Sequence, residues 1–419
     1  MTTSDLTIVG LGYVGLPLAQ EAARRGLKVL GFDVNSSMVE SLNNGLSHID
    51  DLSDDDVSVM LSNGFRATTD PTELAQSNAI VICVPTPLGE SGTPDLSAVE
   101  SAGRTIASHM VSDTLVVLES TTYPGTTEEI LKPILEAGGL VAGQDFLLAY
   151  SPERIDPGNE TYGVSNTPKV VGGMDAASTQ RAVELYGRFI DVIVPTSGTR
   201  EAEMSKLLEN TYRHVNIALV NEMVVFCKDL GIDLWEVIEV AKTKPFGFQA
   251  FYPGPGVGGH CIPIDPNYLS YKVRSLGYPF RFVELAQEIS ERMPSYVVQR
   301  ASQLLNEDRK ALNGSRVLLL GVTYKRNISD QRESPAINIA RRLRQAGAEI
   351  RYCDPHVGHW AIDGVEVEGV LDPVAAVGES ELVILLQDHD AFDLSAIEAA
   401  ANRLLDTRGR LSADHIERL

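Results

Sequence analysis

Short apolar runs alternate with stretches of helical spacing over the N-terminal half of the chain. The first two runs, residues 6–9 and 27–32, flank a predicted helix that runs from a glycine-rich turn to about Arg25. Five more strands are predicted, at residues 79–84, 115–118, 146–150, 170–172 and 192–194. Strands that alternate with helices form doubly wound, mostly parallel sheets, so we predict one such sheet up to about residue 197.

A long amphipathic helix is predicted over residues 200–230. Its apolar positions recur every three or four residues, at Met204, Leu207, Leu208, Thr211, Val215, Ala218 and Leu219. A second long helix is predicted over residues 282–305. A helical segment between two α/β domains often forms a dimer interface, so we expect a homodimer or a higher homo-oligomer.

The strand–helix pattern returns near the C-terminus. Strands are predicted at residues 316–321, 349–353 and 382–386, with a helix at 335–345. The pattern therefore predicts an α/β fold with two Rossmann-like, doubly wound domains joined by a long central helical segment. The predicted domain boundaries are 1–198, 199–308 and 309–419.

A dinucleotide fingerprint lies between the first two predicted strands. Gly10, Gly12 and Gly15 form a Gly-x-Gly-x-x-Gly motif, and Asp33 ends the next strand, 18 residues after Gly15. The first glycine permits a tight turn, the second lets the backbone approach a pyrophosphate, and the third allows close helix packing. A carboxylate at Asp33 accepts hydrogen bonds from a ribose 2′-hydroxyl and repels a 2′-phosphate, so the expected cofactor is NAD. The C-terminal repeat lacks this motif, so no second dinucleotide is expected there.

The charge of the chain excludes several classes of partner. Among 419 residues there are 35 Lys plus Arg and 57 Asp plus Glu, a net charge of −22, so nucleic acid and anionic membrane surfaces are not expected to bind. The densest acidic part, five Asp between residues 50 and 56, is expected to be a solvated surface loop. No apolar run is long enough to span a bilayer, so we expect a cytoplasmic protein.

One of the four cysteines lies in unusual surroundings. Cys83, Cys227 and Cys353 lie in apolar segments and are expected to be buried core thiols. Cys261 lies in a loop rich in glycine and proline, residues 254–261, where no core residue is required. The spacings fit neither a metal site nor a disulfide framework, so no metal is expected.

A reactive thiol beside an NAD site suggests a four-electron oxidation. Cysteine reacts as its thiolate, and Asp265, four residues after Cys261, is a candidate base. In such a reaction a hydride leaves an alcohol carbon, and the thiol captures the resulting aldehyde as a hemithioacetal. A second hydride then leaves, and water cleaves the thioester, so oxyanion stabilisers are needed.

Polar residues that could serve this chemistry lie on the long helix and at strand ends. Lys206, Asn210 and Arg213 share one polar stripe of the helix, and from periodicity alone a solvated face is the favoured interpretation. Thr121 and Glu153 follow predicted strands, where either is able to orient a water. A helix cap is an equally good interpretation of Thr121.

Six motifs together resemble the UDP-glucose/UDP-N-acetylmannosamine dehydrogenase family, in order and over nearly the whole chain. They are residues 9–18 (VGLGYVGLPL), 120–125 (STTYPG), 151–154 (SPER), 203–210 (EMSKLLEN), 256–265 (GVGGHCIPID), and 324–325 (YK) with 330–335 (DQRESP). The resemblance implies an N-terminal NAD domain, a central helical dimer element and a C-terminal UDP-binding domain. It also implies an NAD-dependent oxidation of C6 of a UDP-sugar from alcohol to carboxylate.

The resemblance also assigns roles to residues. It implies six catalytic residues: the nucleophile Cys261, the oxyanion stabilisers Lys206 and Asn210, the supporting acid or base Asp265, and Thr121 and Glu153, which position water and cofactor. The implied cofactor contacts are Gly10, Gly12, Tyr13, Val14, Gly15, Asp33, Thr86, Thr121 and Arg332. The implied substrate contacts are Glu153, Arg154, Ile155, Lys206, Asn210, Arg213, Tyr252, Gly258, Tyr324, Lys325 and Arg408.

Departures from the family pattern bear on the substrate. Members that use UDP-glucose usually have serine before the cysteine and an acidic residue four after the Ser-Pro-Glu glutamate, where this chain has His260 and Pro157. With residues 244–253, these features resemble the N-acetylhexosamine branch, and specifically the UDP-N-acetylglucosamine 6-dehydrogenases of surface-polysaccharide pathways. Many relatives have a basic residue five after the ribose aspartate, and Met38 at that position predicts modest NAD affinity.

The leading hypothesis is therefore a UDP-N-acetyl-D-glucosamine 6-dehydrogenase, with UDP-N-acetyl-D-mannosamine or UDP-glucose as alternative substrates. A two-electron hydroxyacid dehydrogenase would share the first domain and the long helix, but it would not explain Cys261 or the second Rossmann-like domain. A catalytically silent regulator that binds NAD or a nucleotide sugar is disfavoured, because Cys261, Lys206, Asn210 and Asp265 are all present.

Overall fold

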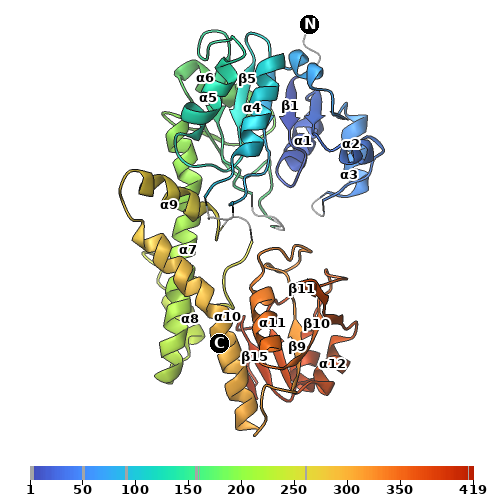
Figure 1. The fold of residues 1–419 in the computed structure, drawn as a ribbon, viewed down its shortest axis with the longest axis vertical. Helices are drawn as coiled ribbons and strands as arrows, with labels where there is room; N and C mark the ends of the chain where they lie inside the picture. Colours follow the sequence, from blue (N-terminus) through green and yellow to red (C-terminus); the bar gives the residue numbers. More distant parts are fainter. Residues whose placement is uncertain are drawn as a thin grey trace. The chain divides into compact units, whose positions relative to one another are not determined.

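The chain divides into two units, which Figure 1 shows in a computed structural model. The structure describes residues 4–49, 52–89, 93–155, 159, 161–259, 262–413 and 415–419. The first unit comprises Met1–Glu209 and Asn267–Tyr278, and the second comprises Asn210–Pro266 and Pro279–Leu419. The division falls within helix α7 (Thr199–Asp229), so this helix contributes residues to both units.

The first unit contains an eight-stranded sheet in the order β3-β2-β1-β4-β5-β6-β7-β8. Its neighbouring strands run parallel, except that β6 and β7 are antiparallel. The strands are β1 (Leu6–Val9), β2 (Val29–Phe32), β3 (Arg66–Thr68), β4 (Ala79–Ile82), β5 (Leu115–Leu118), β6 (Leu147–Tyr150), β7 (Lys169–Gly173) and β8 (Ile193–Pro195). The strand order reverses beside β1, which is the crevice where doubly wound sheets bind nucleotides.

Helices cover both faces of this sheet because strand side chains alternate in direction. Val81 and Val117 pack in one core with residues of α1 and α6, whereas Ile80 and Val116 pack in another with residues of α4. The helices of this unit are α1 (Gly15–Arg24), α2 (Ser36–Asn43), α3 (Asp54–Ser62), α4 (Ser97–His109), α5 (Lys132–Glu136) and α6 (Ala176–Tyr186), with a 3₁₀ segment at Pro71–Gln76 and a π-helical turn at Thr127–Leu131.

The second unit contains a six-stranded parallel sheet in the order β13-β10-β9-β14-β15-β16. Its strands are β9 (Arg316–Leu320), β10 (Glu349–Cys353), β13 (Glu368–Gly369), β14 (Leu382–Leu385), β15 (Leu404–Asp406) and β16 (Ile416–Arg418), beside a hairpin of β11 (Ala361–Ile362) and β12 (Val365–Glu366). Helices α10 (Arg281–Glu307) and α11 (Pro335–Gln345) pack on one face, and α12 (Pro373–Glu379) and α13 (Leu394–Ala400) on the other. Helix α8 (Leu234–Ala241) also belongs to this unit, whereas α9 (Asp265–Ser275) belongs mostly to the first.

The predicted fold class is confirmed, and most of the predicted strands lie within one or two residues of the observed ones. The sequence analysis missed several short elements: β3, α8, α9, β11, β12, β13, α12, α13, β15 and β16. The expectation of a loop over the acidic cluster is wrong for Asp54–Asp56, which form the first turn of α3. Ser53 and Asp56 form a capping box, and acidic residues stabilise a helix N-terminus. Asp50 and Asp51 lie outside the described residues.

The predicted helix is confirmed as α7, and its apolar positions are only partly buried within the chain. Met204, Leu208 and Leu219 are exposed, by 37%, 60% and 52%. The buried side of the helix instead includes polar residues, among them Glu203 and Lys206. A buried charge requires a partner, so each of these residues is expected to bind another polar group of the chain.

Candidate active site

The turn between β1 and α1 has the geometry that a pyrophosphate requires. Gly10 has a φ of +94°, and a Cβ at Gly15 would lie 1.9 Å from the carbonyl oxygen of Gly10, so both positions need glycine. A Cβ at Gly12 would meet nothing within 4 Å, so the space beside this residue is open. No side-chain hydrogen bond caps α1, where Tyr13 and Val14 lead into the helix, and the positive dipole at a helix N-terminus attracts an anion.

Asp33 lies at the end of β2, beside this turn. Its Oδ2 accepts a hydrogen bond from the Leu11 N–H at 2.9 Å, and its Oδ1 accepts one from the Asn35 N–H at 2.9 Å. The residue is half-buried, so the carboxylate is fixed in direction but still reachable. Thr86 follows β4, the strand next to β1, and its carbonyl accepts a hydrogen bond from Tyr268 of α9. The glycine turn and the fixed carboxylate together fit NAD.

Lys206 and Thr121 contact each other in the first unit. Lys206 is only 8% exposed, so its interpretation as part of a solvated face is wrong. Its ammonium donates to Oγ1 of Thr121. One turn earlier on α7, the carboxylate of Glu203 accepts hydrogen bonds from the Gly125 N–H at 2.5 Å, the Thr127 N–H at 2.9 Å and the Thr127 hydroxyl at 2.7 Å. Glu203 therefore caps the segment that follows Thr121, and the sequence analysis gave it no role.

Glu153 belongs to a buried ionic network. Its Oε2 lies 3.1 Å from Nζ of Lys169, which also lies 3.0 Å from Oε2 of Glu119. Tyr186 donates its hydroxyl to the other oxygen of Glu119. The Glu119 side chain is fully buried, and those of Lys169 and Glu153 are 6% and 11% exposed. Burial raises the pKa of Glu153, but the charge of Lys169, the hydrogen bonds from the Ile155 N–H and Lys169, and the charge of Lys206 together lower it below its usual value.

Sequence reasoning missed Lys169 and Glu119, although both leave a signal. Each is a charged residue at the border of an otherwise apolar strand, where a buried charge requires a partner. Burial lowers the pKa of Lys169, but the two carboxylates raise it above the ordinary lysine value, so the ammonium stays charged.

Two predicted substrate contacts lie next to Glu153. The N–H groups of Arg154 and Ile155 donate to Oε1 of Glu153 at 2.6 and 2.7 Å. The Arg154 guanidinium forms a bidentate pair with Glu209, at 3.2 and 2.7 Å, and donates to the Pro168 carbonyl at 2.7 Å. The structure thus holds Arg154 in one orientation.

In the second unit, Asn210 and Asp265 are in direct contact. Asn210 donates from Nδ2 to Oδ2 of Asp265 at 2.6 Å, and Asp265 is 2% exposed at the first turn of α9. Arg213 is exposed. Cys261 and His260 lie outside the described residues, as does Pro157. Cys83, Cys227 and Cys353 are buried, as predicted.

The glycine-rich segment before Cys261 is held on two sides. The Gly254 N–H donates to Oδ1 of the buried Asn221 on α7 at 2.9 Å, a contact that the sequence pattern did not indicate. A Cβ at Gly258 would lie 2.8 Å from Cβ of Tyr324, and a Cβ at Gly259 would lie 2.7 Å from the Tyr324 ring. Glycine is therefore required where this segment meets Tyr324.

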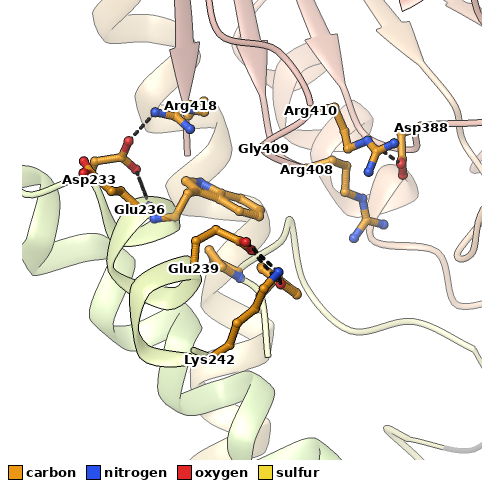
Figure 2. Close-up of a pocket in the computed structure, with 12 residues that line it drawn as sticks. Asp233, Glu236, Glu239, Lys242, Asp388, Arg408, Gly409, Arg410 and Arg418 are labelled. Atoms are coloured by element: carbon orange, nitrogen blue, oxygen red, sulfur yellow. Dashed lines mark hydrogen bonds and ion pairs between the residues drawn. The ribbon is translucent and has the colours of Figure 1, made fainter. Parts of the chain in front are cut away.

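A pocket of about 740 Å³ lies in the second unit and contains two predicted substrate contacts, Arg408 and Tyr252 (Figure 2). Most of its lining is charged, with four acidic and four basic side chains. Figure 2 shows Arg410 directed at Asp388 and Arg418 at Asp233, and both pairs are within ion-pair distance.

Arg408 differs from the other cations of this pocket. Its Nε donates to the Leu386 carbonyl at 2.7 Å, which fixes the side chain. Within the described ranges, no carboxylate lies within ion-pair distance of its guanidinium. Burial lowers the pKa of Arg408, against the opposing effect of nearby carboxylates, so an anionic ligand would stabilise its charge.

The remaining predicted contacts lie on the segment after β9. Tyr324 and Lys325 are half-buried. Arg332, a predicted cofactor contact, is paired with Asp330 at 2.9 and 2.8 Å. In the part of the chain that the structure describes, no three His, Cys, Asp or Glu residues are grouped to hold a metal ion. No helix over the same residues has the length and hydropathy needed to cross a bilayer.

The chain belongs to the UDP-glucose/GDP-mannose dehydrogenase family. Residues 4–190 match its NAD binding domain, residues 200–292 its central domain and residues 318–414 its UDP binding domain. The protein is thus an NAD-dependent nucleotide-sugar dehydrogenase, an oxidoreductase, as the sequence motifs indicated.

Individual relatives differ in the sugar that their names give. The chain is 36% identical to the UDP-N-acetyl-D-glucosamine 6-dehydrogenase of Pseudomonas aeruginosa, over 94% of this chain and 92% of that protein. It is also 36% identical to the NDP-N-acetyl-D-galactosaminuronic acid dehydrogenase of Ralstonia nicotianae, over 98% and 97%. Its fold matches the structure of the UDP-D-ManNAc dehydrogenase of Pyrococcus horikoshii with a TM-score of 0.89 and 32% identity, over 99% and 98% of the two chains.

Removal of the Lys169 charge is expected to destabilise the first unit. Lys169→Met leaves Glu119 and Glu153 buried without their shared cation, which should lower the free energy of unfolding by about 3–5 kcal/mol. Lys169→Arg keeps the charge and should retain most of the stability. Glu119→Gln added to Lys169→Met should recover part of the loss, because one of the two uncompensated charges is gone. Urea unfolding of the four proteins measures this, and a Met variant as stable as wild type would contradict it.

Glu203 is expected to make stability depend on pH. Burial raises the pKa of this carboxyl from its ordinary 4.5 to about 7, although three hydrogen bonds oppose the shift. Between these values the folded chain holds a proton that the unfolded chain has released, so the contribution of Glu203 to stability falls as the pH rises from 4.5 to 7. Glu203→Gln should remove this contribution, so the wild type should lose up to about 3 kcal/mol relative to the variant between pH 5 and 8.

Unfolding by urea at several pH values provides this measurement. The matched control is Glu201→Gln, which removes the carboxyl of an exposed residue two positions earlier on the same helix and so measures the effect of losing one acidic group there. Parallel pH curves for the wild type and Glu203→Gln would show that the carboxyl is already ionised at pH 5.

Proposed function

We propose that this protein oxidises the C6 alcohol of a UDP-N-acetylhexosamine to the carboxylate, with UDP-N-acetyl-D-glucosamine as the substrate. The reaction would take place in the cytoplasm and supply precursors of surface polysaccharide. His260 and Pro157 support the hexosamine branch, as does the Pseudomonas relative at 36% identity. The sugars named for the other relatives make the mannosamine and galactosamine epimers the alternatives to be tested first.

The observation that carries the proposal is the 2.6 Å contact between Asn210 and Asp265. Asp265 lies four residues after Cys261, and Asn210 lies one helical turn after Lys206. The contact thus joins a predicted oxyanion stabiliser to the segment that carries the predicted nucleophile. A buried carboxylate that accepts from Asn210 leaves the amide oxygen and the second N–H of this side chain for other partners.

The proposed chemistry assigns one task to each group. When bound, NAD accepts the hydride that leaves C6 in each of the two oxidations. Between them, the thiolate of Cys261 adds to the aldehyde carbon, while Lys206 and Asn210 donate hydrogen bonds to the oxygen that becomes negative. After the second oxidation, Thr121 and Glu153 orient the water that cleaves the thioester, and the thiol regains its proton with Asp265 as acid or base.

Most residues that this proposal assigns to substrate binding lie in the second unit, whereas Glu153, Arg154, Ile155 and Lys206 lie in the first. Arg408 is a cation fixed by the Leu386 carbonyl in the pocket of Figure 2, and it would hold the diphosphate. Tyr252, Gly258, Tyr324 and Lys325 would contact the rest of the nucleotide sugar, with Arg154, Ile155 and Arg213. The division into an NAD domain at 1–198, a central domain at 199–308 and a UDP domain at 309–419 is part of the same proposal.

The stoichiometry of NADH tests the reaction, and a panel of sugars tests the substrate. With excess NAD, each UDP-N-acetylglucosamine consumed should give two NADH, measured by absorbance at 340 nm. One NADH per sugar would refute the four-electron mechanism. Turnover with UDP-glucose, UDP-N-acetylmannosamine or UDP-N-acetylgalactosamine but not with UDP-N-acetylglucosamine would refute the substrate assignment. In the same assay, Cys261→Ser should lose at least about three orders of magnitude in uronate formation and still bind NAD.

We also propose that a second copy of the chain covers the exposed apolar side of α7. Tyr212, Leu219 and Phe226 recur every seven residues, or two helical turns, and are 48%, 52% and 46% exposed. On α10, Phe282 and Leu285 are 69% and 52% exposed. Apolar rows of this kind on a soluble chain mark protein interfaces, and the same surface on two copies gives a closed dimer.

Leu219→Asp is expected to shift the protein from dimer to monomer, since it places a charge at the centre of this row. Light scattering after gel filtration measures the mass. Val59→Asp, an apolar residue of α3 that is 55% exposed, is the matched control and should leave the mass unchanged. A wild-type chain that elutes as a monomer at micromolar concentration would overturn the dimer.

A further inference from the structure

The two sheets repeat one local arrangement at their nucleotide edges. In the first unit the Gly10 N–H donates to the Phe32 carbonyl at 2.9 Å, and in the second the Gly321 N–H donates to the Cys353 carbonyl at 2.9 Å. Both glycines have a positive φ, of +94° and +75°. An aspartate follows the second strand in each case, Asp33 after β2 and Asp354 after β10.

The two aspartates also accept the same backbone hydrogen bond. Oδ2 of Asp33 accepts from the Leu11 N–H at 2.9 Å, and Oδ2 of Asp354 accepts from the Val322 N–H at 2.7 Å. Asp33 remains half-buried, as a ribose contact requires. The side chain of Asp354 is fully buried, and its Oδ2 lies 3.2 Å from Nε2 of the equally buried His389. Asp354 therefore binds a side chain of the protein, His389, whereas Asp33 lies at the NAD-binding turn.

The hydrogen bonds of His389 fix its protonation. Its Nδ1 accepts from the Asn327 N–H at 2.9 Å, so this nitrogen carries no proton. Nε2 therefore carries the ring proton and donates toward Asp354, with the Thr323 hydroxyl 3.3 Å away. Burial raises the pKa of Asp354, but the hydrogen bond from His389 and those from the backbone lower it below the ordinary value, so the carboxylate is ionised.

Asp354 and His389 thus hold the two ends of one segment, residues 322–327. Asp354 binds the N–H of Val322, and His389 binds the N–H of Asn327. Asn327 has a φ of +61°, which asparagine tolerates but does not prefer, and its side chain exchanges two hydrogen bonds with Asp390, at 2.5 and 2.9 Å. Within the segment, the Thr323 hydroxyl donates to the Lys325 carbonyl at 2.8 Å.

This segment carries Tyr324 and Lys325, which are predicted to contact the substrate. Tyr324 also packs against Gly258 and Gly259, immediately before the positions of His260 and Cys261 in the sequence. A change in the position of the segment would therefore displace two substrate contacts and the wall against which the glycine-rich segment packs.

We propose that His389, oriented by Asp354, is a positioning residue that holds residues 322–327 in the conformation that binds the uridine diphosphate part of the substrate. The inference rests on the proposed function, because it takes Tyr324 and Lys325 as substrate contacts. His389 touches no substrate in this proposal. It acts through the Asn327 N–H, and Asp354 acts by keeping the ring proton on Nε2.

Two substitutions separate the two nitrogens of the ring. His389→Gln places an amide near Nε2 and leaves no acceptor near Nδ1, so the Asn327 N–H loses its partner. His389→Asn places an amide oxygen near Nδ1 and so keeps an acceptor for this N–H. Calorimetric titration with UDP and with NAD, and hydrogen exchange of the peptide that spans residues 322–327, are measured for both variants and for wild type.

We expect His389→Gln to weaken UDP binding at least tenfold and to speed exchange in this peptide, with NAD binding within twofold of wild type. His389→Asn should recover UDP binding to within about threefold and slow the exchange again. The control for general destabilisation is Asp372→Ala, which removes the cap of α12 in the same unit and should lower the melting temperature without a change in UDP binding.

Equal loss of UDP binding in the Gln and Asn variants, or a parallel loss of NAD binding, would show that His389 only fills the core and would overturn the inference. If His389→Gln binds UDP as tightly as the wild type does, the inference is overturned as well, and the proposed function is not affected. A wild-type chain that binds no UDP would overturn the proposed function, and hydrogen exchange would then still report whether His389 holds the segment.

Discussion

The organisation of this molecule depends on the cost of burying polar groups on α7. A carboxylate or an ammonium removed from water is stable only when a partner compensates it, and the buried side of this helix carries both. Glu203 accepts hydrogen bonds from two backbone N–H groups and a hydroxyl of residues 125–127. Lys206 donates to the Thr121 hydroxyl, and Asn210 donates to Asp265. Asn221 accepts a hydrogen bond from the Gly254 N–H. Each partner lies between regular elements or at the start of one, as Thr127 and Asp265 do, so the polar residues of α7 hold the segments that the proposed chemistry needs.

The two Rossmann-like sheets show how one local solution serves two purposes. A glycine after the first strand and an aspartate after the second are required in both, because the aspartate binds the N–H that the turn exposes. In the first unit the carboxylate stays reachable and the following helix has no side-chain cap, which suits a dinucleotide. In the second, His389 covers the carboxylate, and Ser334 caps α11. The second repeat lacks the glycine-rich fingerprint in its sequence, and in the structure its aspartate is covered and its helix is capped by a side chain.

The sequence predicted what depends on local pattern. Buried strands such as residues 115–118 and 349–353 are apolar runs with clear ends, and Gly10, Gly15 and Asp33 follow a spacing that the nucleotide imposes. β3 has only three residues, too few for a pattern, and α9 begins at Asp265 inside what reads as a loop. The Glu119–Lys169–Glu153 network joins residues far apart in the chain, so no window of sequence contains it.

Helix α7 shows the same limit for a long element. Its periodicity placed Met204, Leu208 and Leu219 in an apolar row, although these three are exposed, and favoured a solvated face for Lys206, although it is buried. Periodicity reports that a helix has two kinds of face and does not report which face the chain itself covers. A helix that has apolar residues both on the side packed within the chain and on an exposed side shows the two sets together in its sequence pattern. Only the three-dimensional structure shows which apolar residues are buried and which are exposed.

The net charge of −22 raises the question of how this chain holds anionic ligands. Several arginines are paired with carboxylates: Arg154 with Glu209 in the first unit, and Arg410 with Asp388 and Arg332 with Asp330 in the second. An arginine held in this way loses little side-chain entropy when a phosphate arrives, whereas a free arginine on a mobile stem loses more. In the proposed function, such acidic residues would orient cations that bind a diphosphate, and Arg408, which the Leu386 carbonyl orients instead, would offer its guanidinium to the ligand. The excess of acid over base and the affinity for small anions are compatible because the first is a property of the whole surface and the second of a few fixed groups.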